Sequence, residues 1–166
     1  MKTRIQAHKF RFLPLLAAML MLLPLTACHD DDDDLPRVDF DLAISGATYA
    51  DGVIYVVQGD TLEIESITVV NLEQGKNAAI TAATYYWDGY CLGSTVQPPY
   101  GFEIITDEQT PVGRHSLEIT SPLLAEGKAL ATAVLVYPVQ VVADEADLPG
   151  TGTTTFRGNA ALNTGK

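Results

Sequence analysis

The sequence predicts an all-β protein, an antiparallel β-sandwich of seven or eight strands. Short runs rich in β-branched and aromatic residues recur from residue 38 to residue 142, and turn residues separate them. No stretch after residue 27 carries the i, i+3, i+4, i+7 apolar spacing of an amphipathic helix. Several short strands at regular spacing with turns between them are typical of a sandwich.

The first three strands show apolar and polar residues in alternation. Residues 38–44 place every second side chain on one apolar face, as in a half-buried strand, and Ser45-Gly46 ends this run. A second run covers 53–57 and a third covers 62–70. Residues 71–77, with a glycine inside, are expected to form a loop.

A hairpin follows. Residues 80–87 predict one strand that runs into Asp88-Gly89, a dipeptide that favours a two-residue turn because both positions tolerate positive φ. Residues 90–92 return from the turn, and Gly93-Ser94 ends the return. The chain then passes through Pro98-Pro99, which blocks strand pairing.

The last strands are expected at residues 102–105, 115–119 and 129–142, the last of these being one long strand or a pair of strands. Residues 110–113 form a turn between the first two, and Pro138 marks a bulge or an edge within the third. The tail at 148–166 has no periodicity and is rich in Gly, Thr and Asn, so we expect it to be disordered or loosely attached. The sandwich is therefore placed at residues 38–147.

The first 27 residues have the three parts of a secretory signal: a positive start, an apolar middle and small residues at the cleavage point. The apolar middle, Leu13 to Leu25, is shorter than the roughly 20 residues that span a bilayer. Leu25-Thr26-Ala27-Cys28 resembles the lipobox of bacterial lipoproteins, which implies that Cys28 becomes the lipidated (palmitate-bearing) first residue of the mature chain.

Asp30 to Asp34 follow Cys28 directly, and this acidic run resembles the surface-export signal of Bacteroides-type outer-membrane lipoproteins. That resemblance implies an outer-membrane protein, lipid-anchored and exposed at the cell surface. Residues 28–37 are expected to be a solvated tether, because consecutive aspartates repel one another. Calcium binding is the alternative, but calcium sites need spaced oxygen ligands in a shaped loop.

Charge limits the partners of the mature chain. The whole chain has 10 basic and 21 acidic residues. Four basic residues leave with residues 1–27, so 6 basic and 21 acidic residues remain, a net charge of −15. An acidic surface argues against nucleic acid as a partner. The membrane is expected to be contacted through the lipid on Cys28.

The middle of the chain resembles the bacterial immunoglobulin-like modules of surface proteins and carbohydrate-active enzymes. The matching segments are Tyr85-Tyr86-Trp87-Asp88-Gly89, Leu92-Gly93-Ser94, Pro99-Tyr100 and Pro111-Val112-Gly113-Arg114-His115-Ser116-Leu117. The resemblance implies an immunoglobulin-like sandwich. Alternation assigns Tyr85 and Trp87 to the core and Tyr86 to the outside.

Three aromatic residues are candidate ligand contacts: Tyr86, Tyr90 and Tyr100 flank the hairpin and the proline-rich connection. Exposed aromatic rings can stack on sugar faces, and the alternative is cross-strand packing. Cys91 would have no disulfide partner if Cys28 is lipidated, and we expect it to behave as a small buried hydrophobe rather than a nucleophile. His115 could be a general base, but a structural role is favoured.

No catalytic, cofactor-binding or metal-binding set of residues is recognised in the sequence. Paired carboxylates for glycoside hydrolysis stay an alternative, because acidic residues are plentiful. Leu148-Pro149-Gly150-Thr151-Gly152 matches a sortase pattern without the apolar and basic segments that should follow it. We therefore expect a non-enzymatic surface lipoprotein that acts as a binding or adhesion module. Its expected partner is a glycan or a surface protein. The alternatives are a glycan-binding accessory of a polysaccharide-uptake complex, a small carbohydrate-active hydrolase and a structural subunit of a larger surface assembly.

Overall fold

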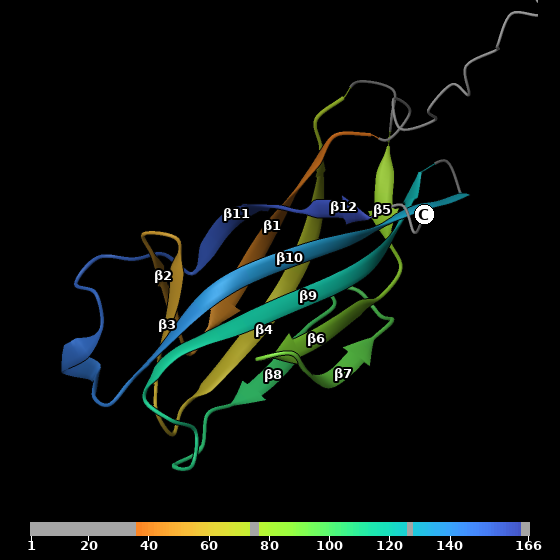
Figure 1. The fold of residues 1–166 in the computed structure, drawn as a ribbon. Helices are drawn as coiled ribbons and strands as arrows, with labels where there is room; N and C mark the ends of the chain where they lie inside the picture. Colours follow the sequence, from red (N-terminus) through yellow and green to blue (C-terminus); the bar gives the residue numbers. More distant parts are fainter. Residues whose placement is uncertain (1–35, 74–76, 126–127, 164–166) are drawn as a thin grey trace, which may run out of the picture. The chain divides into compact units, whose positions relative to one another are not determined.

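The structure is a computed structural model that describes residues 36–73, 77–125 and 128–163, and these residues are almost entirely β (Figure 1). Its strands are β1 (Val38–Ser45), β2 (Thr48–Ala50), β3 (Val53–Val57), β4 (Thr61–Asn71), β5 (Ala78–Ile80), β6 (Ala83–Trp87), β7 (Tyr90–Thr95), β8 (Phe102–Ile105), β9 (Gly113–Ala125), β10 (Lys128–Val142), β11 (Thr155–Asn159) and β12 (Ala161–Asn163). One short 3₁₀ turn, Glu145–Asp147, follows β10.

The strands form two sheets, so the predicted β-sandwich is confirmed. One sheet has four strands in the order β11-β1-β4-β8, and the other has eight, built along β2-β3-β10-β9-β6-β7 with β5 and β12 beside β9 and β10 (Figure 1). The orders β1-β4-β8 and β10-β9-β6 correspond to the A-B-E and G-F-C orders of the immunoglobulin-like sandwich.

Two details of the predicted fold class were wrong. Twelve strands lie in the described residues rather than seven or eight, because several short strands add to the edges. The sandwich is also not purely antiparallel, since β3 runs parallel to β10 over Val139–Val142. The chain leaves β1 for the other sheet, lies along β10 as β3, and then returns to pair with β1 as β4.

The core is formed by the alternate side chains that the two sheets turn toward each other. In the smaller sheet, Phe40, Leu42 and Ile44 of β1 are 0 to 1% exposed, as the period-two pattern of this run requires. In the larger sheet, Tyr85 of β6 and Leu117 of β9 are fully buried. Apolar burial of this kind is the main favourable contribution to folding.

The single strand expected at residues 80–87 is in fact two strands, β5 and β6. Both pair with β9, but β5 pairs at Leu123 to Ala125 and β6 pairs at Leu117 to Thr120. Pro122 lies in the gap between these two stretches and has no N–H to donate, so the ladder is interrupted beside it.

Pro138 does not mark a bulge. It stays in register with Ser116 of β9, and the register shift in β10 lies between Ala129 and Ala131. On the other edge of β10, β12 pairs with residues 132–134 and β3 with residues 139–142. Pro138 therefore lies where β10 pairs with no other described strand on that edge, which is the edge position that proline tolerates.

The C-terminal segment is part of the sandwich, so the expectation of a disordered or loosely attached tail at 148–166 was wrong for residues 155–163. β11 pairs with β1 over five residues, and β12 pairs with β10. Phe156 is 7% exposed and stacks on Tyr49 with ring centroids 3.8 Å apart. The sandwich thus extends to residue 163 rather than ending at 147, because a buried aromatic residue fixes this segment.

Candidate functional site

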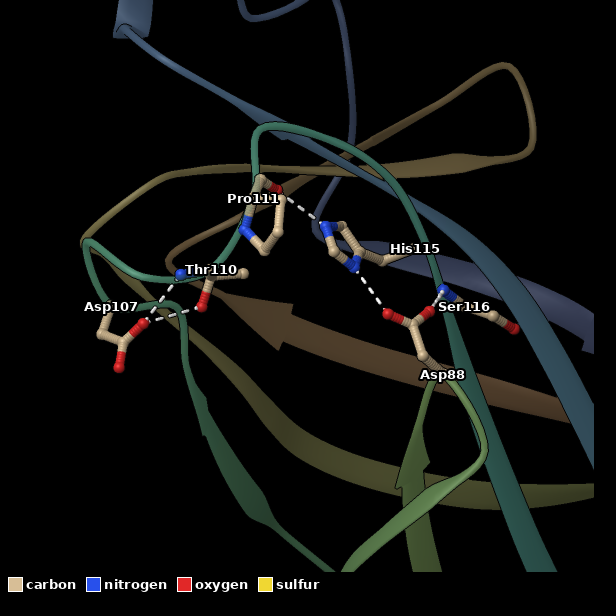
Figure 2. Close-up of polar contacts among 6 residues, drawn as sticks. All are labelled: Asp88, Asp107, Thr110, Pro111, His115 and Ser116. Carbon is tan, nitrogen blue, oxygen red and sulfur yellow. Dashed lines mark hydrogen bonds and ion pairs between the residues drawn. The ribbon is translucent and has the colours of Figure 1, made fainter.

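His115 joins three segments at the end of the β6–β7 hairpin (Figure 2). Its Nδ1 lies 2.7 Å from Oδ2 of Asp88, and its Nε2 lies 2.7 Å from the carbonyl oxygen of Pro111. Oδ1 of the same Asp88 carboxylate accepts the backbone N–H of Ser116 at 2.8 Å. The hairpin turn, the turn before β9 and β9 itself are therefore held together by one imidazole and one carboxylate.

The partners of His115 determine its protonation. A carbonyl oxygen and a carboxylate can only accept hydrogen bonds, so both ring nitrogens donate when both bonds form, and the ring is then an imidazolium. Burial lowers the pKa of His115, whereas the Pro111 carbonyl and the Asp88 carboxylate raise it, and the net result is a raised pKa. A ring engaged in this way has no free lone pair to accept a proton, which fits the structural role expected for His115 rather than that of a general base.

Asp107 fixes the turn that presents the Pro111 carbonyl. Its Oδ1 accepts the backbone N–H of Thr110 at 2.9 Å and the Thr110 hydroxyl at 3.0 Å (Figure 2). An aspartate that bonds the backbone a few residues ahead is a common way to fix a turn. The residues between β8 and β9 are thereby fixed by side-chain hydrogen bonds.

A groove of about 310 Å³ lies between β8 and the β6–β7 hairpin. Trp87 and Leu92 line it from the hairpin, and residues 102–106 with Thr110 line it from β8 and the turn that follows. The Trp87 indole also stacks on the His115 ring, with centroids 5.1 Å apart. The polar junction at His115 therefore supports one wall of an apolar groove.

A β-bulge directs Leu92 into this wall. Tyr85 pairs with Gly93 and Tyr86 pairs with Cys91, so Leu92 is the extra residue on β7. Bulges commonly re-aim a side chain at the edge of a sheet. Nearby, Phe102 of β8 stacks on Tyr85 with centroids 4.5 Å apart, and a Cβ on Gly93 would come within 3.0 Å of the Phe102 ring. The absence of a side chain at Gly93 lets the two sheets meet here.

Large apolar side chains are exposed around the groove. Tyr90 is 78% exposed, Leu92 is 44% exposed and Ile105 is 70% exposed. β7 and β8 are also the last strands of their sheets on this side, as the sheet orders show. We call this region, formed by β7, β8 and the groove between them, the open side of the sandwich. Clustered exposed apolar residues commonly mark interaction sites.

The three candidate aromatic residues do not form one patch. Tyr100 is buried, its hydroxyl donates to the Ile80 carbonyl at 2.7 Å, and its own carbonyl accepts from the buried Tyr85 hydroxyl. Tyr86 is half-buried and pairs with Cys91, whereas Tyr90 pairs with Trp87. Since adjacent residues of a strand point to opposite faces, Tyr86 and Tyr90 lie on different faces of the hairpin. Only Tyr90 remains as an exposed aromatic ring, and the expectation for Tyr100 was wrong.

Two other expectations at the hairpin need correction. Cys91 is an exposed free cysteine rather than a buried one, because β7 is the last strand of its sheet among the described residues. Trp87 is only partly buried and packs at the margin of the core, while Tyr85 holds the fully buried central position. The predicted two-residue turn is correct, with φ of 47° at Asp88 and 81° at Gly89.

Several expectations concern segments beyond the described residues. The signal at 1–27, Cys28 and the aspartates at 30–34 all lie outside them. The Leu148–Gly152 segment is described, and it lies in the connection before β11. Among the described residues, no helix has the length and apolar character needed to cross a membrane.

The sequence did not reveal the groove, because its walls come from strands that meet only in the folded chain. One local signal was available: Ile104 and Ile105 are consecutive apolar residues, so one of them must point away from the core. Ile104 is 5% exposed and Ile105 is 70% exposed. A break in strict alternation on a short strand was therefore the sequence signal of an exposed apolar position.

Neither a protein-family model nor a curated protein matches this chain. Among solved structures, the fibronectin(III)-like modules of Clostridium thermocellum CbhA are similar at 16% sequence identity, with a TM-score of 0.39. That match covers 60% of this chain and 96% of the other.

Proposed function

We propose that this chain is a non-enzymatic binding module, anchored by lipid at the outside of the outer membrane, and that it holds its partner at the open side of the sandwich. The observation that carries the binding role is the groove beside β8, lined by Trp87 and Leu92 and bordered by exposed Tyr90 and Ile105. Apolar grooves bordered by exposed apolar side chains are typical of interaction sites.

Cross-linking on intact cells tests the binding role. A photoreactive amino acid replaces Ile105 on the open side, and in a matched variant it replaces Val136, which is 57% exposed on β10 of the larger sheet. We expect covalent adducts from position 105 and none from position 136. Equal adducts from both positions, or none from either, would contradict a binding role for the open side.

The anchor is proposed from the sequence at Cys28. Three acyl chains, as bacterial lipoproteins usually carry, would give near-permanent attachment, since each buried methylene contributes about 0.8 kcal/mol. The acidic residues that follow would keep the sandwich away from anionic lipid headgroups. Surface display at the end of a tether suits a module that captures a partner from the medium.

The two cysteines provide a matched test of the anchor. Metabolic labelling with palmitate should mark the wild-type chain and Cys91→Ala, and it should fail for Cys28→Ala. Protease added to whole cells should digest the wild-type sandwich if the protein faces the medium. An unlabelled wild-type chain, or one that is protected from protease until the cells are broken, would contradict the proposed location.

Glycan binding is a second candidate, and one observation favours it. Tyr90 is 78% exposed and lies opposite Trp87 across the hairpin, so an aromatic ring is available beside the groove. Affinity electrophoresis in gels that contain soluble polysaccharides would compare the wild type with Tyr90→Ala and with Tyr86→Ala. Retardation lost only in Tyr90→Ala would support a sugar contact, and equal mobility of all three proteins in every gel would count against it.

A further inference from the structure

β8 has a free edge in a setting that favours pairing with another strand. It pairs with β4 on one side only, and it is the last strand of the smaller sheet in the described part of the chain. In a four-stranded immunoglobulin sheet, a further strand lies beside the position of β8. Here the preceding strand, β7, pairs with β6 in the other sheet, so it does not cover this edge.

The side chains of β8 offer little protection against pairing. Natural edge strands are commonly protected by lysine, proline or a bulge. β8 reads Phe-Glu-Ile-Ile, it keeps regular register with β4 along its whole length, and Ile105 is 70% exposed. Its unpaired backbone groups are therefore available to a strand from another molecule.

The faces of β8 specify which side chains an added strand would carry. Ile104 is buried and Phe102 is half-buried, so these two point toward the interior, and Glu103 and Ile105 point outward. In an added strand, the residues opposite Ile104 and Phe102 would point into the groove between β8 and Trp87. At about 310 Å³, this groove is at the small end of ligand sites and suits a few apolar side chains.

The outer face supplies charge complementarity. Glu103 lies directly opposite Glu63 of β4, and like charges in that position destabilise a sheet. Within the part of the chain that the structure describes, no basic side chain pairs with either glutamate. A lysine or arginine on the added strand, opposite Glu103, would offset the repulsion between Glu103 and Glu63 by a favourable charge pair.

We propose that β8 accepts an extended segment of a partner protein as an added strand. The segment alternates apolar side chains, which enter the groove, with a basic side chain opposite Glu103. This deepens the proposed binding role and rests on it. Backbone hydrogen bonds along β8 provide attachment, and the alternating side chains provide selectivity, as in other cases of strand addition.

Selection from a phage-displayed library of random nine-residue peptides tests the proposal. Full-length protein with Cys28→Ala, which removes the proposed lipid, is the target. We expect the enriched peptides to alternate apolar residues with lysine or arginine. On a Glu103→Lys target, acidic residues should replace the basic ones. Failure to enrich any peptide, or enrichment of sequences without alternation, would overturn the proposal.

Trp87 is the only tryptophan in the chain and lines the groove, so its fluorescence reports occupation directly. Binding of an enriched basic peptide should be saturable and roughly tenfold weaker in Glu103→Lys, since attraction becomes repulsion. Glu118→Lys, with the same charge change on β9 of the other sheet, should bind like the wild type. A peptide N-methylated at alternate backbone nitrogens, with the methyl groups on its pairing edge, should not bind.

Two further results would contradict strand addition by a partner protein. If the protein sediments as a dimer that Ile105→Lys converts to a monomer, a second copy occupies the edge and the proposal is wrong. If the N-methylated peptide binds as well as its parent, the backbone edge is not used, and the proposal is also wrong. In either case cross-linking from position 105 could still succeed, so failure of strand addition is distinguishable from failure of the binding role.

Discussion

Replacing Phe156 by alanine should destabilise the whole sandwich, because this residue ties the C-terminal segment into the core. Phe156 is 7% exposed, stacks on Tyr49 at 3.8 Å and meets Tyr137 edge-on at 5.3 Å. Truncating a buried phenylalanine costs about 3 to 5 kcal/mol. β11 is the first strand of its sheet and can relax, so we expect a loss near the lower limit, about 3 kcal/mol.

Urea unfolding followed by Trp87 fluorescence and by circular dichroism measures this loss. In thermal unfolding, the same loss of about 3 kcal/mol should lower the melting temperature by roughly 10 °C in a domain of this size. Tyr90→Ala is the matched control: it removes an aromatic ring that is 78% exposed, and its effect should stay within about 0.5 kcal/mol. If Phe156→Ala costs less than about 1 kcal/mol, or no more than the control, the C-terminal segment does not contribute to the core as argued.

Two further substitutions test particular contacts. Asp88→Asn replaces the carboxylate by an amide, so it keeps a residue type that tolerates positive φ and removes the charge facing His115. We expect the free energy of unfolding to fall by about 1 kcal/mol, a modest loss because the Asp88 side chain is 42% exposed. The pKa of His115 is raised in the folded state, so the stabilisation is fully present below about pH 6.5 and is lost as the pH rises through the folded pKa. The difference in free energy of unfolding between wild type and Asp88→Asn, measured by urea unfolding, should therefore shrink as the pH rises through the folded-state pKa of His115. A difference that grows with pH would contradict an ion pair between Asp88 and His115. Gly158→Ala would place a Cβ 2.0 Å from the Tyr137 hydroxyl, and the resulting overpacking should cost about 1 to 3 kcal/mol in thermal unfolding. An unchanged melting temperature would show that the Tyr137 ring can move aside.

The strands with regular alternation were predictable from sequence. Residues 38–44 gave β1 almost to the residue, and Asp88-Gly89 gave the hairpin, because both signals are local. The break between β5 and β6 was not predicted, since it follows from Pro122 on a neighbouring strand that is distant in sequence. Local patterns report the backbone of a segment and not the hydrogen-bonding ability of its partner.

The ordered C-terminal segment was also not predictable from local sequence patterns. Its composition is that of a loose tail, yet the folded chain pairs it with β1 and β10 and buries Phe156 against Tyr49. Its few apolar residues, Leu148, Phe156 and 160–162, are too widely and irregularly spaced to show a helix or strand period. The burial of Phe156 depends on an available edge of β1, which the isolated segment does not show.

The candidate site was predictable only in part. The sequence placed aromatic residues near the hairpin, yet the fold buries Tyr100 and leaves Tyr90 exposed. The Pro111 to His115 motif was recognised as a resemblance, and the structure gives its physical reason, a bridge from one imidazole to a carbonyl and a carboxylate. No sequence signal placed β7 and β8 on the same side of the molecule.

The order of side chains along the chain by itself determined that the protein is built from strands and where most of them turn, because alternation and turn residues act over a few neighbours. Only the tertiary structure decided which strands lie side by side, which edges stay free and which aromatic rings reach solvent. These properties depend on contacts between segments far apart in sequence, and the groove beside β8 exists only where such segments meet.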